Sequence, residues 1–169
     1  MTKIRRPLAS AALAAILLAG QAPGMGARAQ GTPAPAKPWV VSCSDRGLAG
    51  GLNCAMTQVL IAKNTGQRVV GAAIFRTGDR GAIILRLSLP HGLRLPDGVR
   101  VSIDDGKRTT VPIETADQNG SYANIPVAGD FLAALKRGHM LSVAVTSVRG
   151  EEAAFQLSLD GFTAAFDKL

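Results

Sequence analysis

The sequence is poor in the residues that build metal clusters, disulfide scaffolds and aromatic binding surfaces. Of 169 residues, only 2 are cysteine and 2 are histidine, and aromatic residues make up 4%. Two cysteines are too few for a small disulfide-stapled scaffold or for an all-cysteine metal site. Charged residues account for 18% and apolar residues for 47%, a balance that argues against an intrinsically disordered chain. The length predicts one domain with its own hydrophobic core.

Short motifs of known chemistry are also missing. The sequence contains no GxSxG elbow, no HExxH, no phosphate loop and no dinucleotide fingerprint. His91 lies among turn-forming residues and His139 begins an apolar run, and neither has a nucleophile or carboxylate pattern beside it. We therefore predict no catalytic residue, no metal ligand and no cofactor. Because catalytic groups can assemble from distant positions, an enzyme stays an alternative.

The first 29 residues have the three parts of a secretory signal peptide. Basic residues at 3, 5 and 6 precede an apolar run at 8–20, and Ala27-Arg28-Ala29 offers a small-x-small cleavage site. The competing interpretation is a membrane anchor, but the run has 13 residues where a spanning helix needs roughly 20. We predict a cleaved signal peptide at 1–29, no transmembrane segment after cleavage, and a periplasmic, secreted or cell-surface location.

Most of the basic character belongs to this predicted signal. Cleavage before Gln30 removes four cations and no acids, which lowers the formal net charge from +7 to +3. The remaining cations are scattered, with Trp39 and Tyr122 as the only rings besides phenylalanine, so we predict no nucleic-acid binding. Residues 30–38 (QGTPAPAKP) are predicted to form an extended Pro/Ala linker, and the folded domain is predicted to span 39–169.

Apolar residues in the domain come in short runs separated by Gly, Pro, Asp and Asn. Leu85, Leu87 and Leu89 alternate with polar residues, as do Val99 and Val101, which is the period of a half-buried strand. By this pattern we expect about eight strands, within 39–43, 54–62, 68–76, 81–90, 99–104, 107–114, 139–148 and 151–159. Frequent turns and the absence of βαβ alternation predict a mainly β domain: an antiparallel β-sandwich of immunoglobulin-like or jelly-roll type, or a related barrel.

One or two short helices accompany the strands. The segment 129–137 (GDFLAALKR) has Asp130 as its expected N-cap, an apolar stripe, and Lys136 and Arg137 at its C-terminal end. Gly138 is expected to end this helix. The last segment, 162–169, is predicted to be a short helix or a frayed tail.

Cys43 and Cys54 are separated by ten residues in a Gly-rich span. In an exported protein the expected state of such a pair is a structural disulfide between the end of one strand and the start of the next. A redox-active pair is the alternative, although it would normally have CxxC spacing at a helix start.

The densest cationic stretch surrounds the middle hairpin. Arg94, Arg100, Lys107 and Arg108 would form either a solvated strand face or a contact surface for an acidic partner such as lipopolysaccharide or a host surface. We take these four residues and His91 as candidate surface contacts.

Several segments together resemble a known family. They are Trp39 with Cys43 and Cys54, MTQVL (56–60), ILRLSLPHGLRLPDGV (84–99), SIDDG (102–106), FLAALKRG (131–138) and SLDGFTAAFDKL (158–169). In this order they are similar to the invasion-associated locus B family of exported proteobacterial proteins. The resemblance implies a periplasmic or surface-exposed β-sandwich without known catalytic residues, in a family whose first members were linked to bacterial entry into red blood cells. Family members commonly carry a second cysteine pair, whose positions are occupied here by Ala116 and Ser121.

Three functions follow from these observations. The leading hypothesis is a non-enzymatic exported protein that binds an envelope or host-surface component. The alternatives are a periplasmic enzyme or enzyme inhibitor, with His91 as the first residue to test, and a structural subunit of an envelope assembly.

Overall fold

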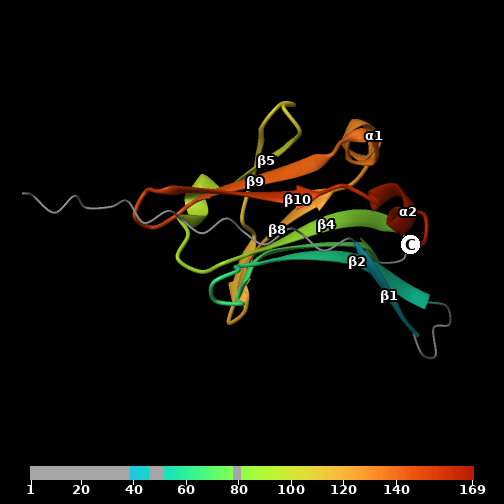
Figure 1. The fold of residues 1–169 in the computed structure, drawn as a ribbon, viewed down its shortest axis with the longest axis horizontal. Helices are drawn as coiled ribbons and strands as arrows, with labels where there is room; N and C mark the ends of the chain where they lie inside the picture. Colours follow the sequence, from blue (N-terminus) through green and yellow to red (C-terminus); the bar gives the residue numbers. More distant parts are fainter. Residues whose placement is uncertain (1–38, 46–51, 78–80) are drawn as a thin grey trace, which may run out of the picture. The chain divides into compact units, whose positions relative to one another are not determined.

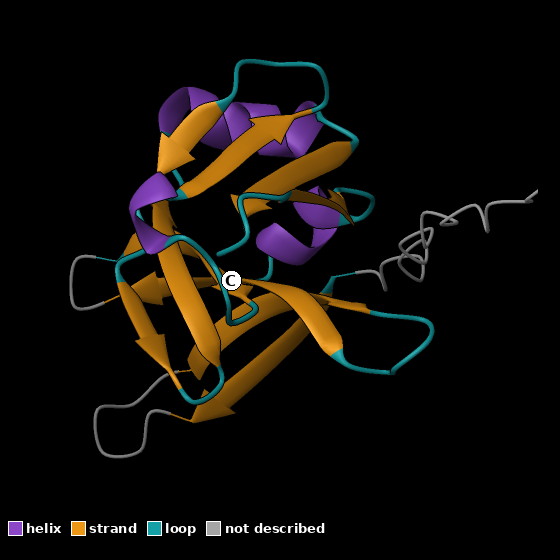
Figure 2. Ribbon diagram, turned by 90° about the vertical axis from the view of Figure 1, so that its left-hand side faces the viewer, coloured by secondary structure: helices purple, strands orange, loops and turns teal. Residues whose placement is uncertain are grey.

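The structure is a computed structural model, and it describes residues 39–45, 52–77 and 81–169. The predicted signal peptide and linker lie outside the described residues. Within these described ranges, ten strands form two antiparallel sheets, and short helices follow the eighth and the tenth strand. Figures 1 and 2 show the strands in two layers, with both helices at the end where β9 begins and β10 ends. The predicted β-sandwich with short helices is confirmed.

The large sheet has six strands in the order β1-β2-β3-β4-β8-β7. Their bounds are Val40–Asp45 (β1), Leu52–Ile61 (β2), Arg68–Thr77 (β3), Ala82–Leu89 (β4), Gly120–Pro126 (β8) and Thr115–Asp117 (β7). Four of the expected strand segments are found in this sheet as β1 to β4, whereas β7 and β8 were not predicted. The strand β8 buries Ser121, Ala123 and Ile125, and small residues at two of these positions conceal the alternation.

The small sheet has four strands in the order β10-β9-β5-β6. Their bounds are Glu152–Ser158 (β10), Met140–Thr146 (β9), Val99–Ile103 (β5) and Thr109–Val111 (β6). A 3-10 helix, η2 (Leu95–Asp97), lies on the connection from β4 in the large sheet to β5 in the small one. The central strands β5 and β9 bury the residues that the alternation assigned to the core, with Val99, Leu141 and Val143 fully buried.

The helix α1 spans Gly129–Arg137, as predicted, but its first turn is not capped as predicted. The N-cap is Ala128, without a side-chain hydrogen bond, and Asp130 lies inside the first turn. Asp130 therefore lies two positions after the N-cap, too far along the chain to cap the helix, although its negative charge is still favourable near the positive end of the helix.

The helix α2 (Phe162–Phe166) is an ordered part of the core and not a frayed tail. Phe162 is 1% exposed, and its ring meets the edge of Trp39 at a centroid distance of 5.5 Å. The Trp39 indole N–H and the Gln58 side-chain amide both donate to the carbonyl of Ser158, each at 3.0 Å. Because Ser158 ends β10 and Gln58 lies in β2, this shared carbonyl joins the two sheets directly.

Cys43 and Cys54 form the predicted disulfide. The two residues are directly opposite in the β1–β2 pair, with their Cα atoms 4.0 Å apart. The bridge therefore holds an edge strand of the large sheet in register.

We expect Phe162→Ala to destabilise the domain by about 3–5 kcal/mol, because it removes a large, fully buried ring beside Trp39. Urea unfolding followed by tryptophan fluorescence would measure this loss. The control is Val148→Ala, which truncates a side chain that is 66% exposed and should change the free energy of unfolding by less than about 0.5 kcal/mol. Equal effects of the two substitutions would contradict the assignment of Phe162 to the core.

Replacement of both cysteines by serine should lower the free energy of unfolding by roughly 3 kcal/mol. The reason is that the unfolded chain, without the bridge, regains the conformational entropy that closing the loop had removed. The measurement is urea unfolding of the double variant and of the wild type with and without reductant. If reductant leaves the wild-type unfolding curve unchanged, the bridge does not stabilise the fold.

Candidate functional site

The outer face of the small sheet is polar and carries small side chains at its centre. Because Val99, Val101 and Ile103 point inward from β5, Arg100 and Ser102 point outward. The same alternation places Met140, Ser142 and Ala144 outward on β9, and Glu152, Ala154 and Gln156 outward on β10. The register aligns Ser102, Ser142 and Gln156 in one row, and Arg100, Ala144 and Ala154 in the next.

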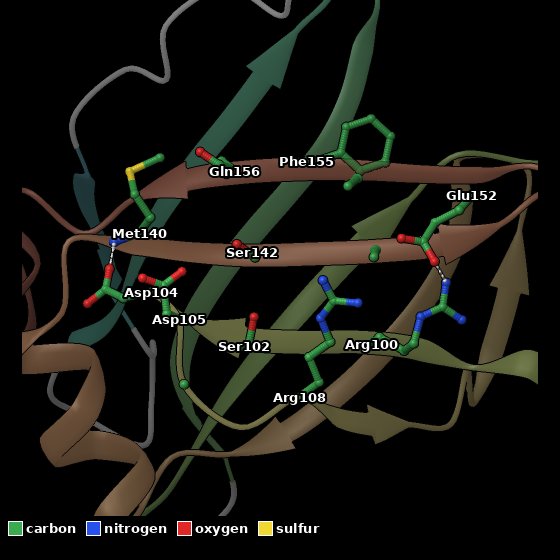
Figure 3. A pocket seen from close by; sticks show the side chains of 13 residues that line it. Arg100, Ser102, Asp104, Asp105, Arg108, Met140, Ser142, Glu152, Phe155 and Gln156 are labelled. Carbon is green, nitrogen blue, oxygen red and sulfur yellow. Dashed lines mark hydrogen bonds and ion pairs between the residues drawn. The ribbon is translucent and has the colours of Figure 1, made fainter.

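The small residues at the centre leave a hollow of about 560 Å³ on this face. Serine and alanine form its floor, and longer side chains from the ends of the strands and from the β5–β6 turn form its walls (Figure 3). Its volume lies within the roughly 300–1,000 Å³ of ligand pockets in proteins. We call this feature the polar hollow. Its lining residues are Arg100, Ser102, Asp104, Asp105, Gly106, Arg108, Met140, Ser142, Ala144, Glu152, Ala154, Phe155 and Gln156.

One end of the polar hollow is closed by an ion pair. The guanidinium of Arg100 lies 2.7 Å from a carboxylate oxygen of Glu152 and 3.4 Å from the hydroxyl of Thr146. Arg100 thus reaches from β5 across β9 to β10. Since the Arg100 and Glu152 side chains are 25% and 52% exposed, the pair adds at most about 1 kcal/mol of stability, but it fixes the position of both charges.

The opposite end is built around Asp104. Its carboxylate accepts hydrogen bonds from the backbone N–H groups of His139 (3.0 Å) and Met140 (2.9 Å), at the start of β9. Asp104 has φ +48°, a left-handed conformation that aspartate tolerates better than most residues. Gly138 is needed beside it, because a Cβ there would lie 2.4 Å from Cγ2 of Ile103.

Arg108 differs from the other charged groups of the hollow. Its side chain extends from the β5–β6 turn over β5 toward the floor (Figure 3). Within the described part of the chain, no hydrogen bond or ion pair holds its guanidinium. It is therefore a charged donor that faces the hollow and is available to a ligand.

The structure separates the five predicted contact residues. Arg100 and Arg108 line the polar hollow, whereas Lys107 lines a different groove, between the β5–β6 hairpin and α1. Arg94 lies beside η2, 3.8 Å from the Asp97 carboxylate. His91 follows β4, and its Nε2 lies 3.2 Å from the carbonyl oxygen of Gln118. Neither Arg94 nor His91 lines the hollow.

Sequence reasoning missed the uncharged residues of the hollow. Ser102, Ser142 and Gln156 have no motif around them, and their common row depends on the pairing of β5, β9 and β10. The available signal was that the outward positions of three alternating segments carry small or polar residues. That signal shows which face each residue is on, but not which strands are neighbours.

The turn between β7 and β8 carries the altered ionisable groups. The Asp117 carboxylate accepts hydrogen bonds from the backbone N–H of Asn119 (2.7 Å) and from the Tyr122 hydroxyl (2.9 Å). These donors, the Asn119 amide first, lower the pKa of Asp117 below its ordinary value of 3.8. The same contact with Asp117 raises the pKa of Tyr122 above its ordinary value of 10.0.

The positions implied for a second cysteine pair are also neighbours in this hairpin. Ala116 and Ser121 are directly opposite in the β7–β8 pair. A disulfide between these two positions would therefore be a cross-strand bridge, as at Cys43 and Cys54. The hydrogen bonds of Asp117 lie at the turn of the same hairpin.

Within the ranges that the structure describes, no three histidine, cysteine or acidic side chains come together as they would around a metal ion. None of the helices described there has the length and apolar character needed to cross a membrane.

These features define a class: a disulfide-tied, two-sheet β domain whose exposed polar hollow lies on a sheet face. The family described as invasion associated locus B (IalB) protein matches residues 39–169, and the chain belongs to this family. The predicted resemblance is confirmed.

Individual relatives agree with this assignment. Two invasion protein B homologues of Brucella abortus, from strain 2308 and from biovar 1 strain 9-941, are each 33% identical over 132 residues, which is 78% of this chain and 75% of theirs. The crystal structure of invasion associated protein b from Bartonella henselae shares the fold, with a TM-score of 0.68 and 22% identity over 81% of this chain and 93% of that one.

The Asp117 contacts predict a loss of stability in acid. Because the pKa of Asp117 is lower in the folded state, its contribution is present above 3.8 and is lost as the pH falls through the folded-state pKa. Between about pH 5 and pH 2, the wild type should therefore lose more stability than Asp117→Asn. Urea unfolding at a series of pH values measures both curves, and parallel curves would contradict the prediction.

Proposed function

We propose that the protein is an exported, non-enzymatic binding protein of the bacterial envelope or cell surface, and that the polar hollow binds an acidic saccharide. The observation that carries the proposal is the guanidinium of Arg108, which faces a floor of small side chains and has no hydrogen-bond or ion-pair partner among the described residues. A free guanidinium above an open floor is suited to a carboxylate or phosphate on a ligand.

The remaining lining residues favour a saccharide over a simple polyanion. Asp105 and Gln156 offer acceptors for sugar hydroxyl groups, and Ser102 and Ser142 can both donate and accept. Phe155 borders the hollow on the edge strand β10, with its ring packed partly against the core. A polyanion would be repelled by the carboxylates, whereas a sugar chain with one acidic group per several hydroxyls matches this mixture.

The arrangement is better suited to binding than to a reaction. No imidazole is among the residues that line the hollow, so the serine hydroxyls there have no histidine beside them to remove a proton. Arg100 and Glu152 are engaged with each other, and Asp104 is engaged with backbone amides. Contacts within the protein fix these charged groups in place, as is expected of groups that bind a ligand without reacting with it.

The location is supported by the sequence and by the names of the relatives. The first 29 residues have the composition of a signal peptide, and the cysteines are paired, as is usual for proteins of an oxidising compartment. The Brucella relatives are named invasion proteins, which supports a place at the envelope or at the surface that meets a host. We propose this location for the present chain, without a specific invasion step.

The experiment is a titration of the purified protein with the polysaccharide part of lipopolysaccharide, freed of its lipid, by isothermal titration calorimetry. Arg108→Ala should weaken binding by about tenfold or more, because it removes a charge-assisted hydrogen-bond donor. The matched control is Lys63→Ala, which removes a cation on the exposed β2–β3 turn and should bind like the wild type.

Two results would contradict the proposal. One is equal affinity of the wild type and Arg108→Ala. The other is a wild-type protein that captures no polysaccharide or envelope component but turns over a substrate in a hydrolase panel, since this result would favour the enzyme alternative.

A further inference from the structure

A second concave feature lies on the other side of the β5–β6 hairpin, between the two sheets. Its walls are the inner face of β5 and β6, the end of β8, and one side of α1. The volume is about 600 Å³. We call it the helix groove. Its lining residues are Val101, Ser102, Ile103, Asp104, Gly106, Lys107, Thr109, Val111, Ile125, Pro126, Asp130, Phe131, Ala134, Arg137 and Gly138.

The interior of the helix groove is apolar. Val101 and Ile125 belong to the buried core, and Ile103, Val111 and Phe131 are partly buried hydrophobic residues packed against it. These side chains come from both sheets and from α1, so the groove opens into the space between the layers. An apolar ligand can therefore bury its surface in the groove without displacing the side chains of the core.

The two cations of the helix groove lie together at the C-terminal end of α1. Arg137 is the last residue of α1, and Lys107 follows the β5–β6 turn. The two belong to the same end, because Gly138 approaches Ile103 and Asp104 at the end of β5. Neither Lys107 nor Arg137 has a side-chain hydrogen bond or ion pair with another described residue.

The acidic groups of the groove do not cancel this cationic end. Asp104 lies at the same end, where its carboxylate accepts from two backbone N–H groups, so one carboxylate there faces the two cations Lys107 and Arg137. Asp130 is in the first turn of α1, about 10 Å from Arg137 along the helix axis. The groove thus has two cations and one carboxylate at one end, an apolar middle, and a second carboxylate at the far end.

We propose that the helix groove binds a fatty acid, with its hydrocarbon chain between the sheets and its carboxylate on Lys107 and Arg137. The charge separation identifies this occupant, because a neutral lipid would gain nothing from the cationic end and a polyanion would leave the apolar middle exposed to water. This site adjoins the polar hollow, with which it shares Ser102, Asp104 and Gly106, but it opens on the other side of the hairpin and does not rest on the function proposed for the hollow.

The test is the binding of cis-parinaric acid, a fluorescent fatty acid, to the purified protein, with displacement by laurate or by dodecanol. We expect the probe to bind the wild type, and laurate to displace it at a concentration about tenfold lower than dodecanol. The difference between laurate and dodecanol measures the contribution of the carboxylate.

Two variants locate the site. Lys107→Glu with Arg137→Glu reverses the exposed charges without changing the apolar wall, and should remove the preference for laurate. The control Lys63→Glu with Arg149→Glu makes the same change in net charge at exposed turns outside the groove, and should keep the preference. Ala134→Phe fills the groove from α1 and should weaken binding of the probe itself, with thermal unfolding showing that the variant is folded.

The results separate clearly. Probe binding that is equal in the wild type and in the Ala134→Phe variant would overturn the site. An undiminished preference for laurate in the charge-reversed variant, or a preference equally lost in the control, would overturn the assignment of the carboxylate. The proposal would also be overturned if the wild type did not bind the probe. If the wild type then formed a dimer that Ala134→Phe abolished, the groove would be assigned to a second copy of the chain.

Discussion

Side chains of a β-strand point alternately to its two faces, and this constraint fixes both the core and the exposed face of the small sheet. Burial of Val99, Val101, Leu141 and Val143 places Arg100, Ser102 and Ser142 on the other side of the same strands. A slip of one residue in β5 or β9 would expose valine and bury arginine. The composition of the polar hollow is therefore a direct consequence of the same apolar contacts that hold the two sheets together.

The β5–β6 hairpin connects the two candidate binding features. Lys107 and Arg108 are adjacent in the sequence, yet Lys107 lines the helix groove and Arg108 lines the polar hollow. One cationic stretch thus supplies one free cation to each of two chemically different concavities. The hydrogen bonds of Asp104 to the start of β9 hold the base of this hairpin, so the positions of both cations depend on a contact that is itself part of the sheet.

The predictability of each element depended on how strongly local chemistry marks it. Leucine and valine alternate with polar residues in β4 and β5, and both strands were found, whereas β8 hides its inward face behind Ser121 and Ala123. Trp39 was expected to open the domain, but its contacts with Phe162 and with the Ser158 carbonyl join residues more than a hundred positions apart in the sequence. Such contacts follow from the stacking of the sheets, which no local pattern encodes.

The candidate site shows the same limit. The cations Arg100 and Arg108 were identified from charge density alone, and so were Arg94 and Lys107, which the fold places elsewhere. Ser102, Ser142 and Gln156 could not be grouped without the order β10-β9-β5. Charge was thus visible in the sequence, whereas the shared face of one sheet was not.

Photo-crosslinking in intact cells tests most directly whether the outer face of β10-β9-β5 is a binding face. A photoreactive amino acid placed at Gln156, an exposed position in the row with Ser102 and Ser142, should form an adduct with a cellular component on illumination. The same amino acid at Asn64, on the exposed β2–β3 turn, should form none. Adducts of equal yield at both positions, or no adduct at Gln156, would contradict the account.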